Sequence, residues 1–323
     1  MSRDLVVALS GGIGGAKLAL GLSRILKPDN LIVVANVGDD FEHLGLHVSP
    51  DSDTLMYALA GLDNTKLGWG RRDETWSFMD TLAALGGEDW FRLGDRDLAV
   101  HVERTRRLKA GEPLSAVIAD FCRRLGVAPR VVPATDDRLR TRLRTDKGWL
   151  DFQDYFVRLQ CRPHLRELAF DGAADARPQP DLMAALGDER LRAVVVCPSN
   201  PFISVEPILA VKGMREALAR CGAPVVAVSP IIGGRAIKGP TAKMMTELGM
   251  IPGAAAVAQR YGDLIDGYVM DVEDAGEAAQ VAAEVTLAPT LMTNLADREQ
   301  LARVVLEAAD ALASSKPSKG FAA

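Results

Sequence analysis

The chain of 323 residues has little cysteine and no long apolar run, and both absences exclude classes of protein. Its four cysteines, Cys122, Cys161, Cys197 and Cys221, are widely spaced and form no Cys-x-x-Cys pair. This spacing argues against zinc clusters and redox dithiols, so we expect buried free thiols in a reducing cytoplasm. No apolar run approaches the length of a membrane-spanning helix, and the N-terminus lacks a signal-peptide pattern. The sequence therefore predicts a cytoplasmic protein without membrane contact.

The chain also lacks an excess of positive charge. Its formal net charge is −5, with 48% apolar and 25% charged residues. A negative protein has no broad attraction for nucleic acid or anionic lipid, so we expect neither as a partner. The composition is that of an ordinary globular protein, and the length suffices for one large domain or two modest ones.

What the chain does have is a strand, a glycine-rich loop and a helix at its start. Residues 5–9 are strand-like, residues 10–17 read SGGIGGAK, and an apolar helix is predicted over 16–26, followed by a strand over 31–37. Glycines let backbone N–H groups approach an anion, and the helix N-terminus favours negative charge. We predict phosphate binding by this loop; a tight turn without a ligand is the alternative. The predicted contacts are Gly11, Gly12, Gly14, Gly15 and Lys17.

The glycine loop matches neither common nucleotide template. A dinucleotide fingerprint starting at Gly12 requires glycine where Lys17 stands, and a P-loop requires other residues than Ala16 and Leu18 around Lys17. An NAD(P)-dependent oxidoreductase and an ordinary P-loop ATPase are therefore not supported.

Four aspartates lie in two clusters beside turn residues between positions 35 and 54: Asp39, Asp40, Asp51 and Asp53. Mg²⁺ near phosphates is usually held by one or two carboxylates, so we predict a Mg²⁺ site, with helix capping as the alternative. We assign metal binding and catalysis to Asp39, Asp40 and Asp53. A helix is predicted after this cluster, capped by Asp53 or Thr54. His43 and His47 do not indicate zinc, because Gly45 and Pro50 argue against a helix between them.

The alternation of strands and helices predicts an α/β, Rossmann-like, doubly wound and mostly parallel sheet. Residues 1–60 and 186–323 are assigned to its nucleotide- and metal-binding core. Residues 61–185 are assigned to a mostly helical insertion, with helices at 74–85, 93–109 and 113–125. Within it, a basic β-hairpin is predicted near 138–159, with Trp149 to Leu159 as the returning strand and no assigned role.

Two later loops follow predicted strands, where open α/β sheets bind ligands. In the loops 198–201 and 229–240 we select Ser199, Asn200, Ser229, Gly233, Gly234 and Lys238. The second loop is predicted to cradle a diphosphate, with an exposed flexible loop as the alternative. Trp69 and Trp76 could stack on a planar ring or pack in the core. Arg96, between Asp95 and Asp97, could hold a ligand or form a local ion pair at a helix start.

Taken in order, these motifs resemble the 2-phospho-L-lactate transferase family. The resemblance covers nearly the whole chain and rests on GGIGGAK (11–17), NVGDD (36–40), PDSDT (50–54), GWGRRDETW (68–76), WFRLGDRD (90–97), PSNP (198–201) and the 229–240 loop. It implies a Mg²⁺-dependent transferase of coenzyme F420 biosynthesis, homodimeric, with residues 61–185 covering a deazaflavin site. A three-carbon acid moves with its phosphate from a guanosine diphosphate adduct to the deazaflavin alcohol Fo, and GMP is released. Asp53 and Arg96 match family positions associated with Fo.

Two choices stay open at this point. A related family of sugar-nucleotide-binding regulators shares the glycine-loop start and the fold, and is the alternative without catalysis. The acid could be 2-phospho-L-lactate, phosphoenolpyruvate or phosphoglycerate, since one hydroxyl or double bond is a small difference that no residue here is assigned to sense.

Overall fold

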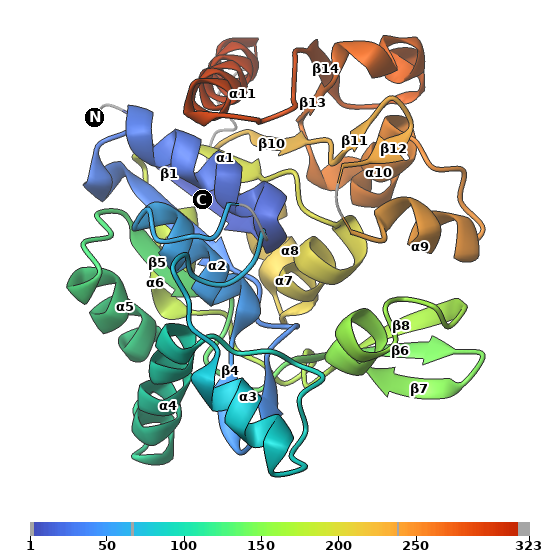
Figure 1. The fold of residues 1–323 in the computed structure, drawn as a ribbon. Coiled ribbons are helices and arrows are strands. Elements are labelled where there is room, and N and C mark those ends of the chain that lie inside the picture. Colours follow the sequence, from blue (N-terminus) through green and yellow to red (C-terminus); the bar gives the residue numbers. More distant parts are fainter. Residues whose placement is uncertain (1–2, 66–67, 238, 316–323) are drawn as a thin grey trace.

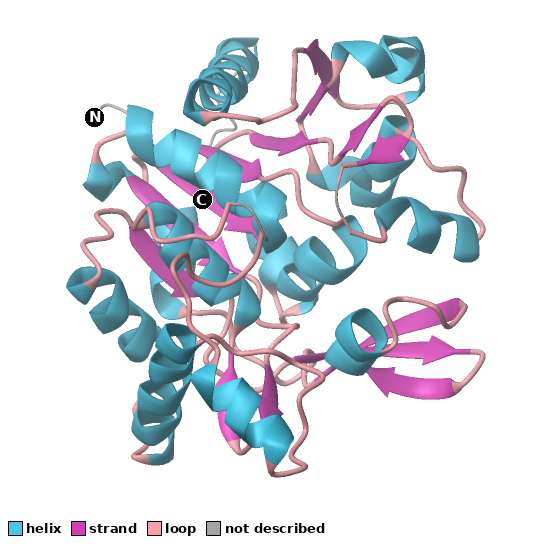
Figure 2. Ribbon diagram, in the orientation of Figure 1, coloured by secondary structure: helices cyan, strands magenta, loops and turns pink. Residues whose placement is uncertain are grey.

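The computed structural model describes residues 3–65, 68–237 and 239–315, and a seven-stranded parallel sheet forms its centre (Figure 1, Figure 2). From one edge to the other the strands are β14 (Glu284–Leu287), β13 (Gly267–Met270), β10 (Val225–Val228), β9 (Leu191–Val196), β1 (Leu5–Ser10), β2 (Leu31–Ala35) and β5 (Arg130–Pro133). Each neighbouring pair is parallel. The predicted α/β, doubly wound class is confirmed, and the strand order reverses between β1 and β9.

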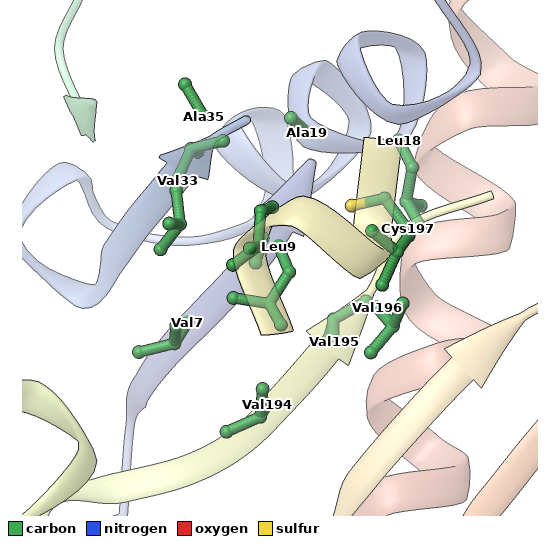
Figure 3. Packing of buried hydrophobic residues seen from close by; sticks show 14 of the residues in the cluster. Val7, Leu9, Leu18, Ala19, Val33, Ala35, Val194, Val195, Val196 and Cys197 are labelled. Carbon is green, nitrogen blue, oxygen red and sulfur yellow. The ribbon is translucent and has the colours of Figure 1, made fainter. Parts of the chain in front are cut away.

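The inner strands form because their sequences are runs of β-branched and aliphatic residues that pack on both faces. β1, β2 and β9 are buried along nearly their whole length, and Figure 3 shows Val7, Val33 and Val195 in this core. Helix α1 (Gly12–Ile25) packs over one face against both α2 (Pro50–Leu59) and α11 (Leu295–Ser315). Parallel crossover connections are right-handed, so connections that run in opposite directions along the sheet place their helices on opposite faces. The connection from β9 to β10 therefore places α8 (Met214–Arg220) on the face opposite α1, where it contacts α6 (Pro180–Leu186).

The remaining elements connect this frame. The helices are η1 (Pro28–Asn30), α3 (Ser77–Ala84), α4 (Asp95–Lys109), α5 (Leu114–Arg124), η2 (Asp154–Arg158), η3 (Pro201–Val205), α7 (Glu206–Ala210), α9 (Thr241–Glu247), α10 (Ala254–Tyr261), η4 (Gly262–Leu264) and η5 (Val272–Gln280). The strands are β3 (Phe41–His43), β4 (Leu46–Val48), β6 (Arg140–Thr145), β7 (Gly148–Asp151), β8 (Leu165–Asp171), β11 (Ile231–Ile232) and β12 (Arg235–Ala236).

The region 61–185 contains the three predicted helices, which begin one to three residues later than predicted. It also contributes β5 to the central sheet, and no pattern led us to expect that strand. Residues 61–185 are therefore tied to the sheet by one edge strand, and the division into core and insertion stays a prediction.

The predicted basic hairpin is present as β6 and β7, but the returning strand is much shorter than predicted. It ends at Asp151, and the chain then forms a π-helical turn, η2, where continued strand was expected. β8 pairs with the other edge of β6, so residues 140–171 form a three-stranded unit that we call the side module. Two of its arginines are paired across strands: Arg142 lies 2.9 Å from Asp151, and Arg144 lies 2.8 Å from Glu167. Part of the basic face is thus neutralised locally.

The predictions about the cysteines and about membrane-spanning helices can be compared with the structure. All four cysteines are free; three are buried and Cys161 is partly exposed. Within the described ranges, none of the helices combines the length and apolar character that a membrane span requires.

Candidate functional site

A cavity of about 820 Å³ opens at the carboxyl ends of β1 and β9, where the strand order reverses. This is the place where open parallel sheets bind ligands. Of the predicted site residues, the cavity lining includes Gly11, Gly12, Gly14, Lys17, Asp39, Trp69, Ser199, Asn200 and Ser229. The lining does not include Gly15, Asp40, Asp53, Arg96, Gly233 and Gly234, and Lys238 lies outside the described residues.

The glycine segment is the first turn of a helix rather than a loop. We predicted that the helix begins at residue 16, but α1 begins at Gly12, with Gly11 as its N-cap and no side-chain cap. Gly12 has a φ of +64°, which glycine adopts without strain. A side chain at Gly14 would collide with the carbonyl oxygen of Pro198. The glycines therefore let the helix start lie directly against the loop after β9, and its N-terminal dipole faces the cavity.

Asp39 and Asp51 form a pair at this end of the cavity. The Asn36 side-chain amide donates to Asp39 Oδ1 at 3.1 Å and to Asp51 Oδ2 at 2.9 Å. The Gly12 N–H donates to Asp51 Oδ1 at 2.7 Å. We call Asp39 and Asp51 the cavity pair; both line the cavity and both receive bonds from neutral donors.

Burial raises the pKa of both carboxyl groups of the cavity pair. For Asp39 the pKa rises well above its usual range, and the neighbouring Asp51 charge raises it further. Burial raises the pKa of Asp51 to about 6, although the bonds from Asn36 and Gly12 act in the opposite direction. A cation between these carboxylates would offset the cost of keeping both charged.

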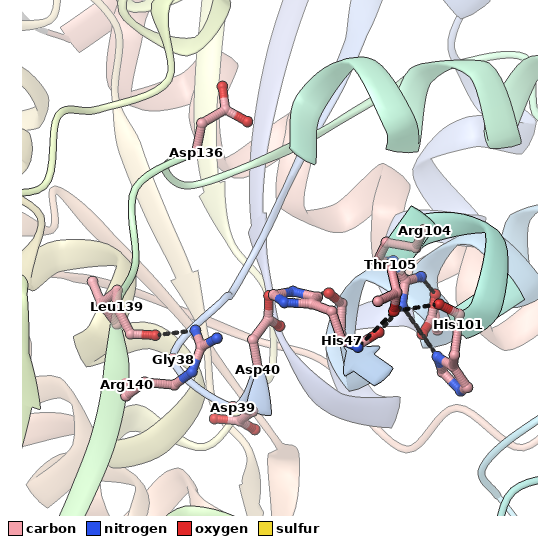
Figure 4. Close-up of polar contacts among 12 residues, drawn as sticks. Gly38, Asp39, Asp40, His47, His101, Arg104, Thr105, Asp136, Leu139 and Arg140 are labelled. Atoms are coloured by element: carbon pink, nitrogen blue, oxygen red, sulfur yellow. Dashed lines mark hydrogen bonds and ion pairs between the residues drawn. The ribbon is translucent and has the colours of Figure 1, made fainter. Parts of the chain in front are cut away.

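Asp53 faces the other way. The helix predicted to be capped by Asp53 or Thr54 begins earlier, at Pro50, a favoured first residue of helices. Asp53 accepts bonds from both terminal nitrogens of Arg104, a fully buried residue of α4 (Figure 4). His101 lies 3.7 Å from Asp53 and 3.3 Å from Asp97.

Tyr57 completes this group, since its hydroxyl donates to Asp97 at 2.5 Å. We call Asp53, Tyr57, Asp97, His101 and Arg104 the buried network. Burial raises the pKa of Asp53, and the Arg104 charge offsets part of that rise. For Asp97, burial raises the pKa, but the hydrogen bonds and charge from His101 and Tyr57 outweigh it and the net pKa is lowered.

The fourth aspartate, Asp40, has local partners. The Ser49 hydroxyl donates to Asp40 Oδ2 at 3.0 Å, and His47 Nε2 lies 3.2 Å from the same oxygen. His47 and His43 lie in the hairpin of β4 and β3, as expected of residues that are not on a helix. The four aspartates therefore divide among three environments, of which only the cavity pair lines the cavity.

Among the described residues, two groups have side chains that suit a metal ion. Ligand atoms of Asp53, Asp97 and His101 lie within 4.8 Å of one another. However, a buried guanidinium already compensates Asp53, and a divalent ion beside Arg104 would add repulsion. The cavity pair has oxygen ligands, faces the cavity and shares a neutral donor, so it fits a hard cation better. Asp51, which we did not assign to the metal, lines the cavity, whereas the predicted ligands Asp40 and Asp53 do not.

Aromatic side chains form another part of the cavity lining. We call this surface the aromatic wall, and it consists of Trp69, Trp90, Phe91, Phe152 and Phe156. The rings of Phe152 and Phe156 are stacked, with centroids 5.3 Å apart. Trp76 is outside the lining, and the Arg92 guanidinium lies 4.6 Å from its ring centroid. Four of the five wall residues were not predicted, because the five come from three segments that only the fold brings together.

The later loops contribute hydrogen-bonding groups to the cavity. Ser199 Oγ accepts from the Gly11 N–H at 3.2 Å, and Asn200 Oδ1 accepts from the N–H of Phe202 at 2.9 Å. The Gly234 N–H donates to Asp274 at 3.0 Å, so this donor, predicted to cradle a diphosphate, is bonded within the protein.

Two predicted cations have definite places. Lys17 reaches across the cavity edge and donates to the carbonyl oxygen of Met292 at 2.7 Å. Arg96 is exposed in the first turn of α4, where its N–H donates to Glu74 at 2.8 Å. The structure brings Lys17 to the cavity and places Arg96 outside it.

Comparisons with known proteins agree with this architecture. The family model described as 2-phospho-L-lactate transferase CofD matches residues 6–309. The phosphoenolpyruvate transferase of Streptomyces coelicolor is 41% identical over 314 residues, covering 94% of this chain and 98% of the relative. The phosphoenolpyruvate transferase of Nocardia farcinica is 38% identical over 318 residues, covering 94% of each. A crystal structure of a UPF0052 family member from Bacillus halodurans has a TM-score of 0.62 at 14% identity, covering 95% of this chain and 99% of that one, and shows the fold alone.

Proposed function

The chain belongs to the 2-phospho-L-lactate transferase CofD family, and on that premise we propose that it makes a phosphodiester of coenzyme F420 biosynthesis. In this proposal a guanosine diphosphate adduct of a three-carbon acid reacts with the ribityl hydroxyl of the deazaflavin Fo, and GMP is released. We propose phosphoenolpyruvate as the acid, because relatives at about 40% identity are phosphoenolpyruvate transferases by name.

The observation that carries the proposal is the arrangement of the cavity. The lining includes the cavity pair, the start of α1 and Ser199, which suit a diphosphate and a cation. It also includes the aromatic wall, which suits a planar ring system. The volume, about 820 Å³, is within the range of pockets that bind small molecules. A reaction between a nucleotide adduct and a deazaflavin needs both kinds of surface in one cavity.

The two kinds of surface come from different parts of the chain. The aromatic wall belongs entirely to residues 61–185, whereas the cavity pair, the α1 start and Ser199 belong to 1–60 and 186–323. This division supports the proposal that residues 61–185 cover the deazaflavin while the Rossmann-like core holds the nucleotide and metal.

We assign the Mg²⁺ ligands to Asp39 and Asp51, in place of the predicted set of Asp39, Asp40 and Asp53. Bound Mg²⁺ would neutralise charge on the phosphoryl oxygens. The chain's own part is positioning: the α1 N-terminus and Ser199 orient the diphosphate, and the aromatic wall directs the ribityl chain toward it. The hydroxyl oxygen forms a bond to the phosphorus that bears the acid and loses its proton to water. The bond from that phosphorus to the oxygen of GMP breaks, and GMP leaves with the electron pair.

A direct assay tests the proposal. The protein is mixed with Mg²⁺, Fo and either the enolpyruvyl or the lactyl guanosine diphosphate, and GMP and the phosphodiester are measured by mass spectrometry. We expect product that disappears with EDTA, and faster reaction with the enolpyruvyl adduct. Absence of product with both adducts, together with tight binding of a sugar nucleotide, would instead support a regulator. On the family resemblance, we also propose that the protein is cytoplasmic and forms a homodimer. Sedimentation of the purified protein tests the oligomeric state.

A further inference from the structure

The side module contacts the acid turn, residues 38–40, although more than 100 residues separate them in sequence. The main-chain N–H of Thr141, in β6, donates to the carbonyl oxygen of Gly38 at 2.8 Å. The Gln153 side-chain amide, just after β7, donates to the carbonyl oxygen of Asp39 at 3.2 Å. Figure 4 shows Gly38, Asp39 and Asp40 together with Arg140 of the neighbouring strand. The side module thus bonds two successive carbonyl groups of the turn that carries half of the cavity pair.

The fit around this turn is close. A Cβ atom at Gly38 would lie 2.7 Å from the Thr141 hydroxyl and 2.7 Å from Cβ of Pro207. The turn is therefore confined between the side module and α7, and only glycine fits without displacement of one neighbour. Inside the turn, the Asp40 N–H donates to the carbonyl oxygen of Val37 at 3.2 Å. The main chain of Asp39 is held from both sides.

Gln153 is the side-chain part of this contact. It is 5% exposed and belongs to the cavity lining, so its amide group sits in a desolvated position. Hydrogen bonds in such positions restrain geometry strongly, because the donor and acceptor have few other partners. With its carbonyl fixed by Gln153, Asp39 directs its carboxylate to the Asn36 amide that Asp51 shares.

The other side of the module is fixed to helix α9. The Leu165 N–H donates to Glu247 at 3.0 Å, and Lys243 Nζ donates to the carbonyl oxygen of Pro163 at 3.2 Å. The loop leading into α9 lines the same cavity through Pro240 and Thr241. The module is therefore bonded both to the acid turn and to α9, whose first residue lines the cavity.

We propose that Gln153 is a positioning residue for the cation site, acting on Asp39 through its main chain, and that this is the role of the side module. The inference rests on the proposed assignment of Mg²⁺ to the cavity pair. Residues that hold metal ligands in place typically contribute about 10–100-fold to metal affinity. Because Gln153 does not itself touch the cation, its loss weakens binding without removing a ligand.

The test is direct Mg²⁺ binding by calorimetry, with Mn²⁺ and electron paramagnetic resonance as a second probe. The variant Gln153→Met keeps the side-chain volume but removes the donor. We expect Mg²⁺ to bind about tenfold more weakly, with a raised Mg²⁺ requirement for turnover and an unchanged KM for Fo. The matched control is Gln259→Met: Gln259 is exposed on α10 and also donates to a main-chain carbonyl, at 3.5 Å from Gln280. It should bind Mg²⁺ as the wild type does.

Each outcome decides a different question. Wild-type Mg²⁺ affinity in a folded Gln153→Met protein would overturn the positioning role while leaving the cation site intact. Absence of Mg²⁺ and Mn²⁺ binding by the wild type would overturn the cation site and this inference with it. If Gln153→Met does not fold, Gln153→Asn, whose shorter amide cannot reach Asp39, takes its place with the same expected tenfold loss.

Discussion

Asp51 and Asp53 lie two residues apart in helix α2, yet their surroundings are opposite. Asp51 faces the cavity with Asp39 and accepts bonds from a neutral amide and a main-chain N–H. Asp53 faces α4 and is bonded to the guanidinium of Arg104 inside the protein. Among the described residues, the hydrogen-bond donors to Asp51 are neutral, whereas Asp53 is bonded to the positively charged Arg104. The comparison shows that a cluster of acids in a sequence can contain both a ligand site and a structural ion pair.

The geometry of a helix explains the divergence. At 3.6 residues per turn, side chains two positions apart differ by about 200° around the axis. Asp51 and Asp53 are both in the first turn of α2, so they must point to opposite sides. Asp39 and Asp40 diverge as well, since one bonds Asn36 and the other bonds Ser49.

Removal of the buried guanidinium of Arg104 should have the largest effect, and the effect is on the stability of the fold. Arg104→Met leaves Asp53 and Asp97 buried without a guanidinium, and breaking such a pair costs about 3–5 kcal/mol. We expect the free energy of unfolding in urea at pH 7 to fall by that amount. The matched control is Arg106→Met on the same helix, because Arg106 is 65% exposed and paired with an exposed glutamate. Its loss should cost less than about 0.5 kcal/mol. Equal effects of the two variants would mean that the buried network does not stabilise the fold.

Asparagine substitutions in α2 should then separate activity from stability. Asp51→Asn removes one carboxylate of the cavity pair, so we expect turnover to fall about 10²–10³-fold, as for loss of several kcal/mol of charge stabilisation. Asp53→Asn should reduce stability by about 1–3 kcal/mol, because Arg104 loses its charged partner. Its turnover should stay within about tenfold of the wild type at a temperature where the protein is folded.

The reverse pattern would contradict the assignment. If Asp53→Asn abolishes turnover in a fully folded protein and Asp51→Asn is active, the cation lies at the buried network. Mg²⁺ titration and urea unfolding of both variants together distinguish a lost ligand from a lost fold, since only a lost fold lowers the free energy of unfolding.

The pH dependence of stability sharpens the comparison further. The folded-state pKa of Asp51, about 6, lies above the value of an unfolded aspartate, so the folded state binds that proton more tightly. In metal-free protein Asp51 therefore costs stability above pH 6, and that cost is relieved as the pH falls from 6 toward 4. We expect the stability of Asp51→Asn relative to wild type to decrease by about 1 kcal/mol between pH 7 and pH 5. Urea unfolding in EDTA measures this. If the stability difference between Asp51→Asn and wild type does not change with pH, the pKa of Asp51 is not raised in the folded protein.

Local patterns sufficed for most of the frame and for part of the site. Runs such as Leu5–Ser10 and Leu191–Val196 are continuous and apolar, so their place in a parallel sheet could be predicted. β5 was missed because a four-residue strand ending in Pro133 carries little periodicity of its own. The start of α2 was placed too late, although proline at its first position is a recognised signal. With the acids expected before the helix, the opposite directions of Asp51 and Asp53 around its axis were not predicted.

Contacts between distant segments could not be predicted in this way. The bond of Arg104 to Asp53 spans 51 residues, and that of Gln153 to Asp39 spans 114. Neither has a local signal, because an arginine or a glutamine on a helix or after a strand is ordinary at the surface. Only tertiary packing decides that these two are buried and paired.

The smallest effect is expected at the aromatic wall, where two tryptophans allow a close comparison. Trp69 is 46% exposed and lines the cavity, while Trp149 is 45% exposed on β7 and does not. An aromatic contact adds about 0.5–1.5 kcal/mol, so Trp69→Ala should raise the KM for Fo about threefold with little change in kcat. Trp149→Ala should leave KM unchanged, because equal exposure alone confers no contact with the ligand. If both substitutions raise KM equally, the effect is on the fold of residues 61–185 rather than on ring binding. If Trp69→Ala lowers kcat instead, Trp69 contacts the ring of Fo in the transition state and not in the bound ground state.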